Sequence, residues 1–272
     1  ERLLCRAMVD SEKDEAICLQ NEFEWVLHKE VHAVLNQLST ILVECSRKFP
    51  FVFNTDAPQK HEKFVLTSGL DQLKCVVSLS GDCISHADIN FKVQRQQIVN
   101  YRTSIQSENP WRLHQIQDAV NHLHQALITI ENIDKDYVFR SSDEVLHILG
   151  NILGCLQRGR TSLILPRKRT IDDLMKSRNM KCLNPVLPED LALSFYIQSH
   201  KLVFAVYQVS SIQGTMKFES HQAEASVPWL NDVLVLFTVA LQLGQQLKDK
   251  ISVFAQYKDF TVGSQPIHCM AY

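Results

Sequence analysis

Four stretches of the chain carry apolar residues at alternating spacings of three and four, and this pattern limits most strongly what the chain can fold into. The first lies within residues 17–48, and the others follow at 113–130, 145–163 and 233–254. Such spacing places the apolar side chains along one face of an α-helix. Because four such faces in one chain can cover one another, we expect them to pack internally and not as a zipper between two chains.

The stripes consist of Leu27, Val31, Val34, Leu38, Ile41 and Cys45; of Leu113, Ile116, Val120, Leu123, Leu127 and Ile130; of Val145, Leu149, Ile152, Leu156 and Leu163; and of Val233, Phe237, Ala240, Gly244, Leu247, Ile251 and Phe254. Asn109 and Pro110 are typical of a helix start and predict the beginning of the second helix. Ser141 or Ser142, with Glu144, resembles a capping box at the third.

Between these helices the hydrophobic period falls to two, which is typical of β-strands. Ile89, Phe91 and Val93, for example, alternate with polar neighbours. Residues 62–106 predict four antiparallel strands joined by short turns, and residues 190–222 predict a further strand pair with another strand near 216–221.

Together these elements predict an α+β protein, with a bundle of long antiparallel helices (N-terminal, two central and C-terminal) beside a small antiparallel β-region. Both parts are discontinuous in sequence. We assign residues 16–49, 108–164 and 227–257 to the helical domain, and 62–106 and 190–222 to the β-domain. Residues 165–189 contain three prolines and little periodicity, and are the predicted linker.

Composition argues against several classes of protein. With 28 Lys+Arg against 30 Asp+Glu, the net charge of −2 gives no reason to expect nucleic acid as a partner. The eight cysteines stand singly, without Cys-x-x-Cys pairs, and the chain has no Asn-x-Ser/Thr sequon. The longest apolar run, near residues 233–241, is about half the ~20 residues that a membrane span requires. We therefore expect a cytoplasmic protein.

Two segments come near to known catalytic motifs without matching them. Residues 154–161 resemble a phosphate-binding P-loop, but Arg160 stands where that loop needs lysine, and a helical stripe passes through the segment. His28 and His32 have the spacing of a zinc-protease motif, but Lys29 replaces its glutamate. Close helix packing and the helical stripe explain these residues better than nucleotide or zinc binding.

Two side-chain groups are weaker candidates for chemistry. His114, Asp118 and His122 would lie along one helix face as a partial metal site, but that face points away from the apolar stripe and into solvent. Cys83 and His86 could form a nucleophile pair, yet no third group orients them. We therefore predict that the chain is not an enzyme and holds no metal or cofactor.

Two polar segments could serve recognition. Arg167, Lys168 and Arg169 form a short basic run that would suit a nuclear-localisation signal or an anionic surface, although a solvated loop explains so short a run better. On the last helix, a polar set is the candidate for contact with a partner. It consists of Gln245, Lys248, Asp249 and Lys250.

Several segments resemble the Rogdi family. They are residues 228–254 (PWLNDVLVLFTVALQLGQQLKDKISVF), 22–38 (EFEWVLHKEVHAVLNQL), 111–127 (WRLHQIQDAVNHLHQAL), 187–191 (LPEDL), Tyr196-Ile197 and Val206-Tyr207-Gln208. The resemblance implies a leucine-zipper protein whose seams fold internally into an α-domain beside a β-domain. It also implies that the N- and C-terminal helices pack together.

The Rogdi family is similar to the small subunit of the RAVE or rabconnectin-3 complex, which promotes assembly of the V-ATPase. The resemblance thus implies a non-enzymatic adaptor that binds large WD-repeat rabconnectin-3 subunits. Because the apolar stripes should pack internally, we expect the protein to be monomeric alone. It would reach endosomal, lysosomal or synaptic-vesicle membranes only through partners, with a role in neuronal function. A coiled-coil dimerisation protein with a nuclear or regulatory role stays open as the alternative, because of the heptads and the basic run.

Overall fold

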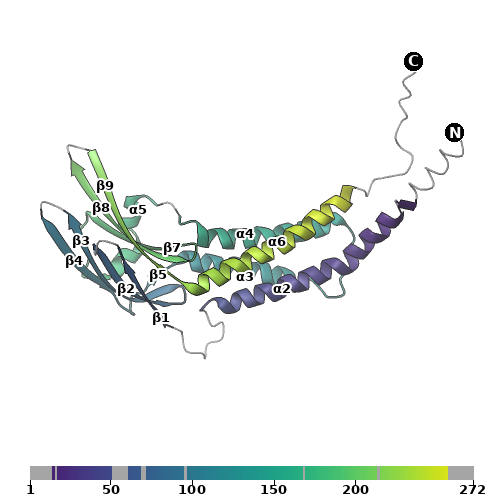
Figure 1. The fold of residues 1–272 in the computed structure, drawn as a ribbon, viewed down its shortest axis with the longest axis horizontal. Helices are drawn as coiled ribbons and strands as arrows, with labels where there is room; N and C mark the ends of the chain where they lie inside the picture. Colours follow the sequence, from purple (N-terminus) through teal and green to yellow (C-terminus); the bar gives the residue numbers. More distant parts are fainter. Residues whose placement is uncertain are drawn as a thin grey trace, which may run out of the picture.

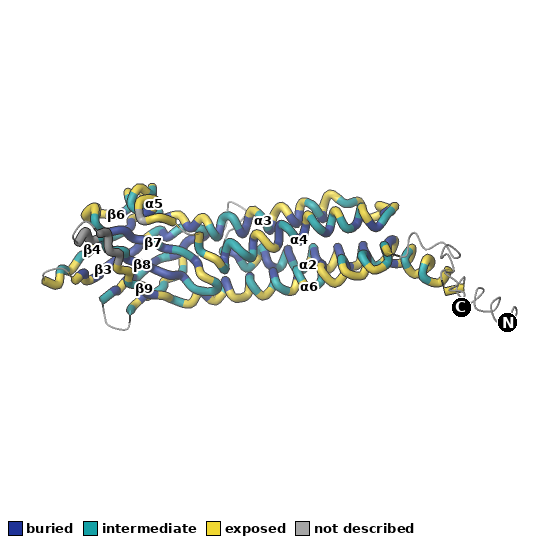
Figure 2. The backbone as a smooth tube through the Cα atoms, turned by 90° about the horizontal axis from the view of Figure 1, so that it is seen from above, coloured by how far each residue is buried: buried dark blue, intermediate teal, exposed yellow. Residues whose placement is uncertain are grey.

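The computed structural model describes residues 14–15, 17–50, 61–68, 72–94, 97–167, 169–212 and 215–256. A curved β-sheet forms one end of an elongated molecule, and four long helices extend from it to form the other end (Figure 1). In a view turned by 90°, the buried stretches of the helices lie toward the neighbouring helices and the exposed stretches lie on the outside (Figure 2).

The four long helices are antiparallel to their neighbours (Figure 1). They are α2 (Val31–Lys48), α3 (His114–Glu131), α4 (Ser142–Ile164) and α6 (Pro228–Gln256). A π-helical turn, Val26–Glu30, precedes α2. Helix α2 packs along α6, α6 along α4, and α4 along α3, whereas α2 and α3 touch less extensively. As the family resemblance implied, the first and last long helices therefore lie side by side.

The predicted apolar stripes are buried within this one chain, apart from Ile41 and Phe254, which are partly buried. On α2, Leu42 is fully buried in place of Ile41, and Leu35 is also inside. An α-helix has 3.6 residues per turn, so a contact face drifts around it relative to a strict heptad. The real buried stripe of α2 is therefore wider than the predicted seam.

Of the two predicted helix starts, the one at α4 is confirmed and the one at α3 is wrong. At α4 the Ser141 side chain accepts a hydrogen bond from the Glu144 backbone N–H at 3.3 Å, which confirms Ser141 as the N-cap. The prediction for α3 is wrong, because this helix begins at His114 and not after Asn109-Pro110. The intervening Trp111 and Arg112 pair with a strand instead, so sheet pairing prevails over the local capping preference.

The nine strands of the described residues belong to one antiparallel sheet, in the order β6-β4-β3-β2-β1-β9-β8-β7, with β5 paired to β3. The strands are β1 (His61–Thr67), β2 (Leu73–Ser80), β3 (Cys83–Gln94), β4 (Ile98–Ile105), β5 (Trp111–Arg112), β6 (Leu183–Asn184), β7 (Leu191–Gln198), β8 (Lys201–Ile212) and β9 (Thr215–Ser226).

The expected fold, a helical bundle beside a small β-region, is therefore wrong. The sheet is large and makes up one end of the molecule, so the helices are only part of the architecture. The two groups of strands, which α3 and α4 separate in sequence, join where Thr67 of β1 lies opposite Glu224 of β9. Alternating residues predict single strands but not such a distant pairing, and this is why the sheet looked small.

The sheet curls over an aromatic core. Trp111, on the β3 side of the sheet, meets Phe195 of the edge strand β7 edge to face, with ring centroids 5.3 Å apart. Phe195 in turn stacks on Phe204 of β8 at 4.7 Å. Rings from opposite ends of the strand order can meet only if the sheet bends round, so these contacts define its curvature.

Residues 165–189, the predicted linker, contain two short helical segments as well as β6. These are α5 (Ile171–Met175) and the 3₁₀-helix η2 (Arg178–Cys182). Leu174 is buried, and the Thr103 hydroxyl of β4 donates to the Pro185 carbonyl at 2.8 Å. The segment 165–189 therefore packs against the sheet. The predicted division of the chain into two discontinuous domains stays a prediction.

Candidate functional site

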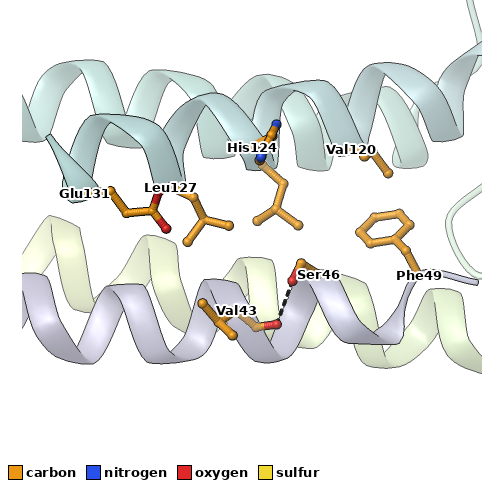
Figure 3. A pocket seen from close by; sticks show the side chains of 8 residues that line it. Val43, Ser46, Phe49, Val120, His124, Leu127 and Glu131 are labelled. Atoms are coloured by element: carbon orange, nitrogen blue, oxygen red, sulfur yellow. Dashed lines mark hydrogen bonds between the residues drawn. The ribbon is translucent and has the colours of Figure 1, made fainter. Parts of the chain in front are cut away.

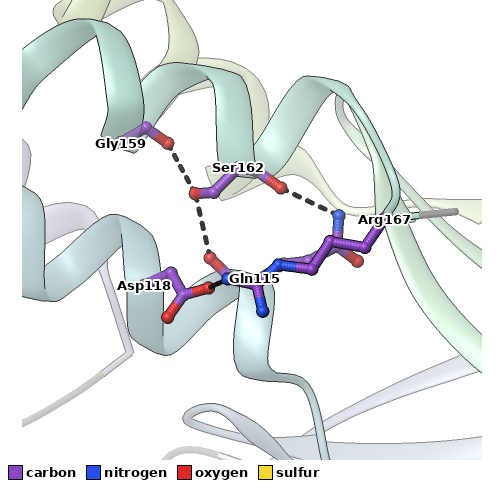
Figure 4. Close-up of polar contacts among 5 residues, drawn as sticks. All are labelled: Gln115, Asp118, Gly159, Ser162 and Arg167. Carbon is purple, nitrogen blue, oxygen red and sulfur yellow. Dashed lines mark hydrogen bonds and ion pairs between the residues drawn. The ribbon is translucent and has the colours of Figure 1, made fainter.

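A polar joint connects the helices to the sheet, and Gln115 in the first turn of α3 is its centre. Figure 4 shows its contact with Ser162 of α4. Its amide nitrogen donates to the carbonyls of Ser162 on α4 and Ile197 on β7, both at 2.8 Å. Its amide oxygen accepts the Ile197 N–H, also at 2.8 Å. The Gln115 side chain thus pairs with Ile197 as a neighbouring strand would, and it fixes α3, α4 and β7 relative to one another.

The surface of α6 between its neighbours α2 and α4 is uncharged. Val235 is 51% exposed and Val239 is 43% exposed, and Gln242 and Gln246 continue the same exposed face. No charged residue occurs in α6 between Asp232 and Lys248. We call the four residues Val235, Val239, Gln242 and Gln246 the α6 face. Because charged residues are depleted in the centres of protein interfaces, this composition favours contact with another protein.

A groove of about 210 Å³ lies between α2 and α3 (Figure 3). It is lined by Val43, Ser46, Phe49, Val120, Leu123, His124, Leu127 and Glu131. Pockets for cofactors and drug-sized ligands usually measure ~300–1,000 Å³. The groove is therefore too small for such a ligand, and its mostly apolar lining marks the place where the ring of four helices is least tightly closed.

The sequence model of a protein family described as "Rogdi leucine zipper containing protein" matches residues 22–259. The chain belongs to the Rogdi family. It is 57% identical to "Protein rogdi" of Drosophila melanogaster over 267 residues, covering 98% of this chain and all of that protein. It is also similar to "Protein rogdi homolog" of Homo sapiens, with 39% identity over 89% of this chain and 94% of the human protein. The family's description names a structural feature, the leucine zipper, and no catalytic activity.

In this Rogdi family member the three residues considered as a partial metal site, His114, Asp118 and His122, make separate contacts. The Asp118 carboxylate pairs with the Arg167 guanidinium at 2.6 Å (Figure 4), while His114 is exposed at the start of α3. His122 faces α4, where its Cβ would lie 3.3 Å from a Cβ at Gly159. No group of three or more His, Cys, Asp or Glu side chains suited to a metal ion occurs among the described residues.

The P-loop-like residues 154–161 lie inside α4, so they form no phosphate-binding loop. A Cβ atom on Gly159 would approach the Phe237 ring of α6 to 3.1 Å. Gly159 therefore permits close packing of α4 on α6, which agrees with the packing role predicted for this segment. Arg160, which stands at the lysine position of the motif, donates to the Thr238 hydroxyl of α6 at 3.2 Å.

Cys83 and His86 do not form an activated pair. The Cys83 thiol donates to the Asp82 carboxylate at 3.2 Å, and His86 is exposed further along β3. Burial, followed by the hydrogen bond and the charge of Asp82, raises the pKa of Cys83 to about 12. Since the thiolate is the reactive form, this environment suppresses nucleophilic chemistry.

The zinc-protease-like segment has a packing role. His32 Nε2 lies 2.7 Å from the Tyr137 carbonyl oxygen, and its ring packs on Phe139 with centroids 5.1 Å apart. His28 is exposed in the π-helical turn. His32 therefore fastens the α3–α4 loop onto α2.

The four residues predicted for partner contact differ in their availability. Lys250 binds the Glu30 carboxylate at 2.9 Å and so ties α6 to the π-helical turn before α2. Gln245 donates to Asp249 at 2.7 Å, and both side chains remain exposed. Lys248 is half-buried. Gln245 and Asp249 thus extend the surface of α6, whereas Lys250 already serves an internal contact.

Sequence reasoning missed the α6 face, because its valines belong to an apolar run that was considered only as core or as a membrane span. The width of that run could have revealed the face, since α6 is apolar beyond the stripe that α2 and α4 can cover.

No helix among the described residues has the length and hydropathy needed to cross a membrane. Within the basic run, Lys168 lies outside the described residues, and Arg169 is exposed.

Proposed function

We propose that this Rogdi family protein is a non-enzymatic adaptor subunit of a RAVE/rabconnectin-3-type complex, which promotes V-ATPase assembly and organelle acidification. The α6 face carries the proposal, because an uncharged exposed strip flanked by packed helices suits a protein partner. The Gln115 joint supports it, since a rigid connection holds distant surfaces in one arrangement. The choice of WD-repeat rabconnectin-3 subunits as partners rests on the family resemblance.

The side chains considered as catalytic candidates make contacts within the chain, and this also favours an adaptor over an enzyme. Asp118 pairs with Arg167, Cys83 is held as a protonated thiol, and His32 contacts the α3–α4 loop. Each of these groups has a packing or pairing role that explains its position. Catalysis would need such groups to converge on one accessible point.

No observation favours the alternative of a zipper-type dimerisation protein. The heptad positions that would form such a zipper, for example Leu38 and Leu247, are buried against other helices of the same chain. A zipper between two copies would require these helices to separate first. We therefore propose a monomer that binds its partners through its outer surfaces.

The proposed location follows from the proposed partners. The protein would be cytoplasmic and would reach endosomal, lysosomal or synaptic-vesicle membranes only through the complex, in keeping with a neuronal role. A nuclear pool would depend on the basic run, in which Arg167 is engaged with Asp118.

Binding to the purified large WD-repeat subunits tests the proposal. We expect the full chain to retain them at micromolar concentration. Val239→Asp should weaken binding at least tenfold, which is about 1.4 kcal/mol, because it places a charge in the centre of the α6 face. Ile128→Asp on α3 is the matched control, since Ile128 is also an exposed apolar residue on a helix and should tolerate the change.

Circular dichroism establishes that both variants remain folded. Failure of the unmodified chain to retain the subunits would overturn the adaptor function. Equal binding by the Val239→Asp variant and the unmodified chain would instead remove the α6 face as the contact surface.

A further inference from the structure

Among the described residues, strand β4 has a neighbouring strand along only a short part of its outer edge. Its inner edge pairs with β3 along its whole length, whereas its outer edge pairs with β6 only through Ser104 and Ile105. Pro185 follows directly after the last β6 residue and has no N–H to continue the ladder. Among the described residues, no strand lies beside residues 98–102 on this outer edge.

The opposite edge of the sheet is closed by side chains. On β7 the Gln115 amide pairs with both the N–H and the carbonyl of Ile197. Further along β7, the Leu193 N–H contacts the Met180 sulfur at 3.4 Å. Because unpaired edges attract other strands, proteins usually cover them in such ways. The fold thus protects β7 and leaves β4 accessible.

Exposed apolar side chains lie at both ends of the open β4 edge. Val186, two residues beyond β6, is 75% exposed, and Ile98, the first residue of β4, is 67% exposed. These are the highest exposures among the large apolar side chains of the described residues. An added strand would cover both of them while its backbone paired with the outer edge of β4.

On strands β2 to β4, the sheet face beside this edge carries three cations against one carboxylate, Asp88, which lies opposite Ser104 near the β6 end. Arg102 of β4 lies opposite Asn90 of β3, which in turn lies opposite Lys74 of β2, and Lys92 lies opposite Asn100. Lys74, Lys92 and Arg102 are all exposed, and none forms an ion pair with a described residue. A strand laid along β4 would therefore gain from acidic side chains on this face.

The other face of the same edge is apolar. Val99 and Tyr101 alternate with the exposed Asn100 and Arg102 and are half-buried. Tyr101 stacks on Phe91 of β3 with ring centroids 5.5 Å apart. Because side chains alternate between faces, the occupant should alternate as well, with apolar residues toward Val99 and Tyr101.

We propose that the open edge of β4 binds an extended acidic segment of a partner protein as an added strand. Its acidic residues face Lys92 and Arg102, and the alternate apolar residues cover Val99 and Tyr101. Lys92 and Arg102 would also attract an anionic membrane. A membrane, however, has no peptide groups that could pair with residues 98–102, and its surface lacks the alternation of acidic and apolar side chains that a strand provides. The inference deepens the proposed adaptor function and rests on it, because it names a second surface, distant from the α6 face, for holding a partner.

A short fluorescent peptide of alternating glutamate and valine tests the inference on the full chain. We expect it to bind, and to slow hydrogen–deuterium exchange at the backbone amides of residues 98–103 but not at those of β7. A peptide of alternating lysine and valine should bind at least tenfold more weakly. Arg102→Glu should weaken binding of the glutamate peptide at least tenfold, whereas Lys135→Glu, an exposed charge reversal on the α3–α4 loop, should leave it unchanged.

Three outcomes would overturn the inference. They are unchanged exchange at residues 98–103, equal binding of the two peptides, and Arg102-dependent binding of phosphatidylserine vesicles by a chain that does not bind the glutamate peptide. The failure of this surface is separable from failure of the adaptor function. A chain that retains the WD-repeat subunits without binding the peptide loses only the β4 site, whereas a chain that binds neither loses both.

Discussion

Cys45 shows how a single buried residue connects two helices. Its thiol lies on the buried face of α2 and points at the Val233 carbonyl of α6, with sulfur and oxygen 3.9 Å apart. Burial, reinforced by the charge of Glu44, raises the pKa of Cys45 from its ordinary value of 9.0 to about 12. By contrast, Cys18 is exposed.

The raised pKa of Cys45 predicts a loss of stability in alkali. Above pH 9 the unfolded chain releases the thiol proton while the folded chain keeps it up to about pH 12, so the free energy of unfolding falls as pH rises through this window. The contribution of one thiol is up to about 1.4 kcal/mol per pH unit.

Cys45→Ala should therefore make the free energy of unfolding fall less steeply above pH 9. Urea unfolding at several alkaline pH values measures this slope. The exposed Cys18→Ala is the control and should keep the slope of the unmodified chain. Identical slopes for both variants would contradict the assignment.

Helix α4 predicts opposite effects for two of its glycines. A Cβ atom at Gly150 would meet nothing within 4 Å, so Gly150→Ala should raise the free energy of unfolding by about 0.5–1 kcal/mol through helix propensity. At Gly159 the Phe237 ring and His122 leave no such space, and Gly159→Val should lower it by about 1–3 kcal/mol. The denaturant midpoints of the two variants, each compared with that of the unmodified chain, test this prediction. If both midpoints shift in the same direction, the packing described for α4 is refuted.

At the scale of elements, sequence patterns predicted the long helices and the longer strands well. Apolar periodicity is local, so the stripes around Leu38 and Phe237 and the alternation around Phe91 could be read directly. The two-residue strands β5 and β6 escaped prediction because they exist only through pairing with β3 and β4. A strand of two residues is too short to show a period of two in the sequence.

The candidate surfaces were harder to predict than the elements. An apolar residue such as Val239 looks alike in sequence whether a neighbouring helix covers it or not. The open edge of β4 depends on where β6 ends, and the closure of β7 depends on Gln115, which lies on a distant helix. These properties arise from tertiary arrangement, which spacing alone does not encode.

At the scale of the whole molecule, the Gln115 joint should control how firmly the helices hold the sheet. Gln115→Ala leaves the Ile197 N–H and the carbonyls of Ile197 and Ser162 without this partner. A hydrogen bond contributes about 0.5–1.5 kcal/mol net, so the loss of these three bonds should lower the free energy of unfolding by about 1.5–4.5 kcal/mol.

Urea unfolding measures this loss, and hydrogen exchange near Ile197 should accelerate in the same variant. Gln125→Ala, an exposed position on the same helix, provides the control and should change stability by less than about 0.5 kcal/mol. A similar stability for the two variants would show that the joint does not connect the two ends of the molecule energetically.

The pairing of Thr67 with Glu224 also means that the sheet can be completed only late in synthesis. Strand β1 leaves the ribosome long before β9 exists, and α2 likewise precedes α6, against which its buried face packs. The early half of the chain must therefore wait with an open strand edge and an uncovered apolar helix face, a condition that favours chaperone binding and aggregation. A premature stop before β9 would leave both unprotected, so a truncated chain would be cleared by quality control and would not persist as a smaller working protein.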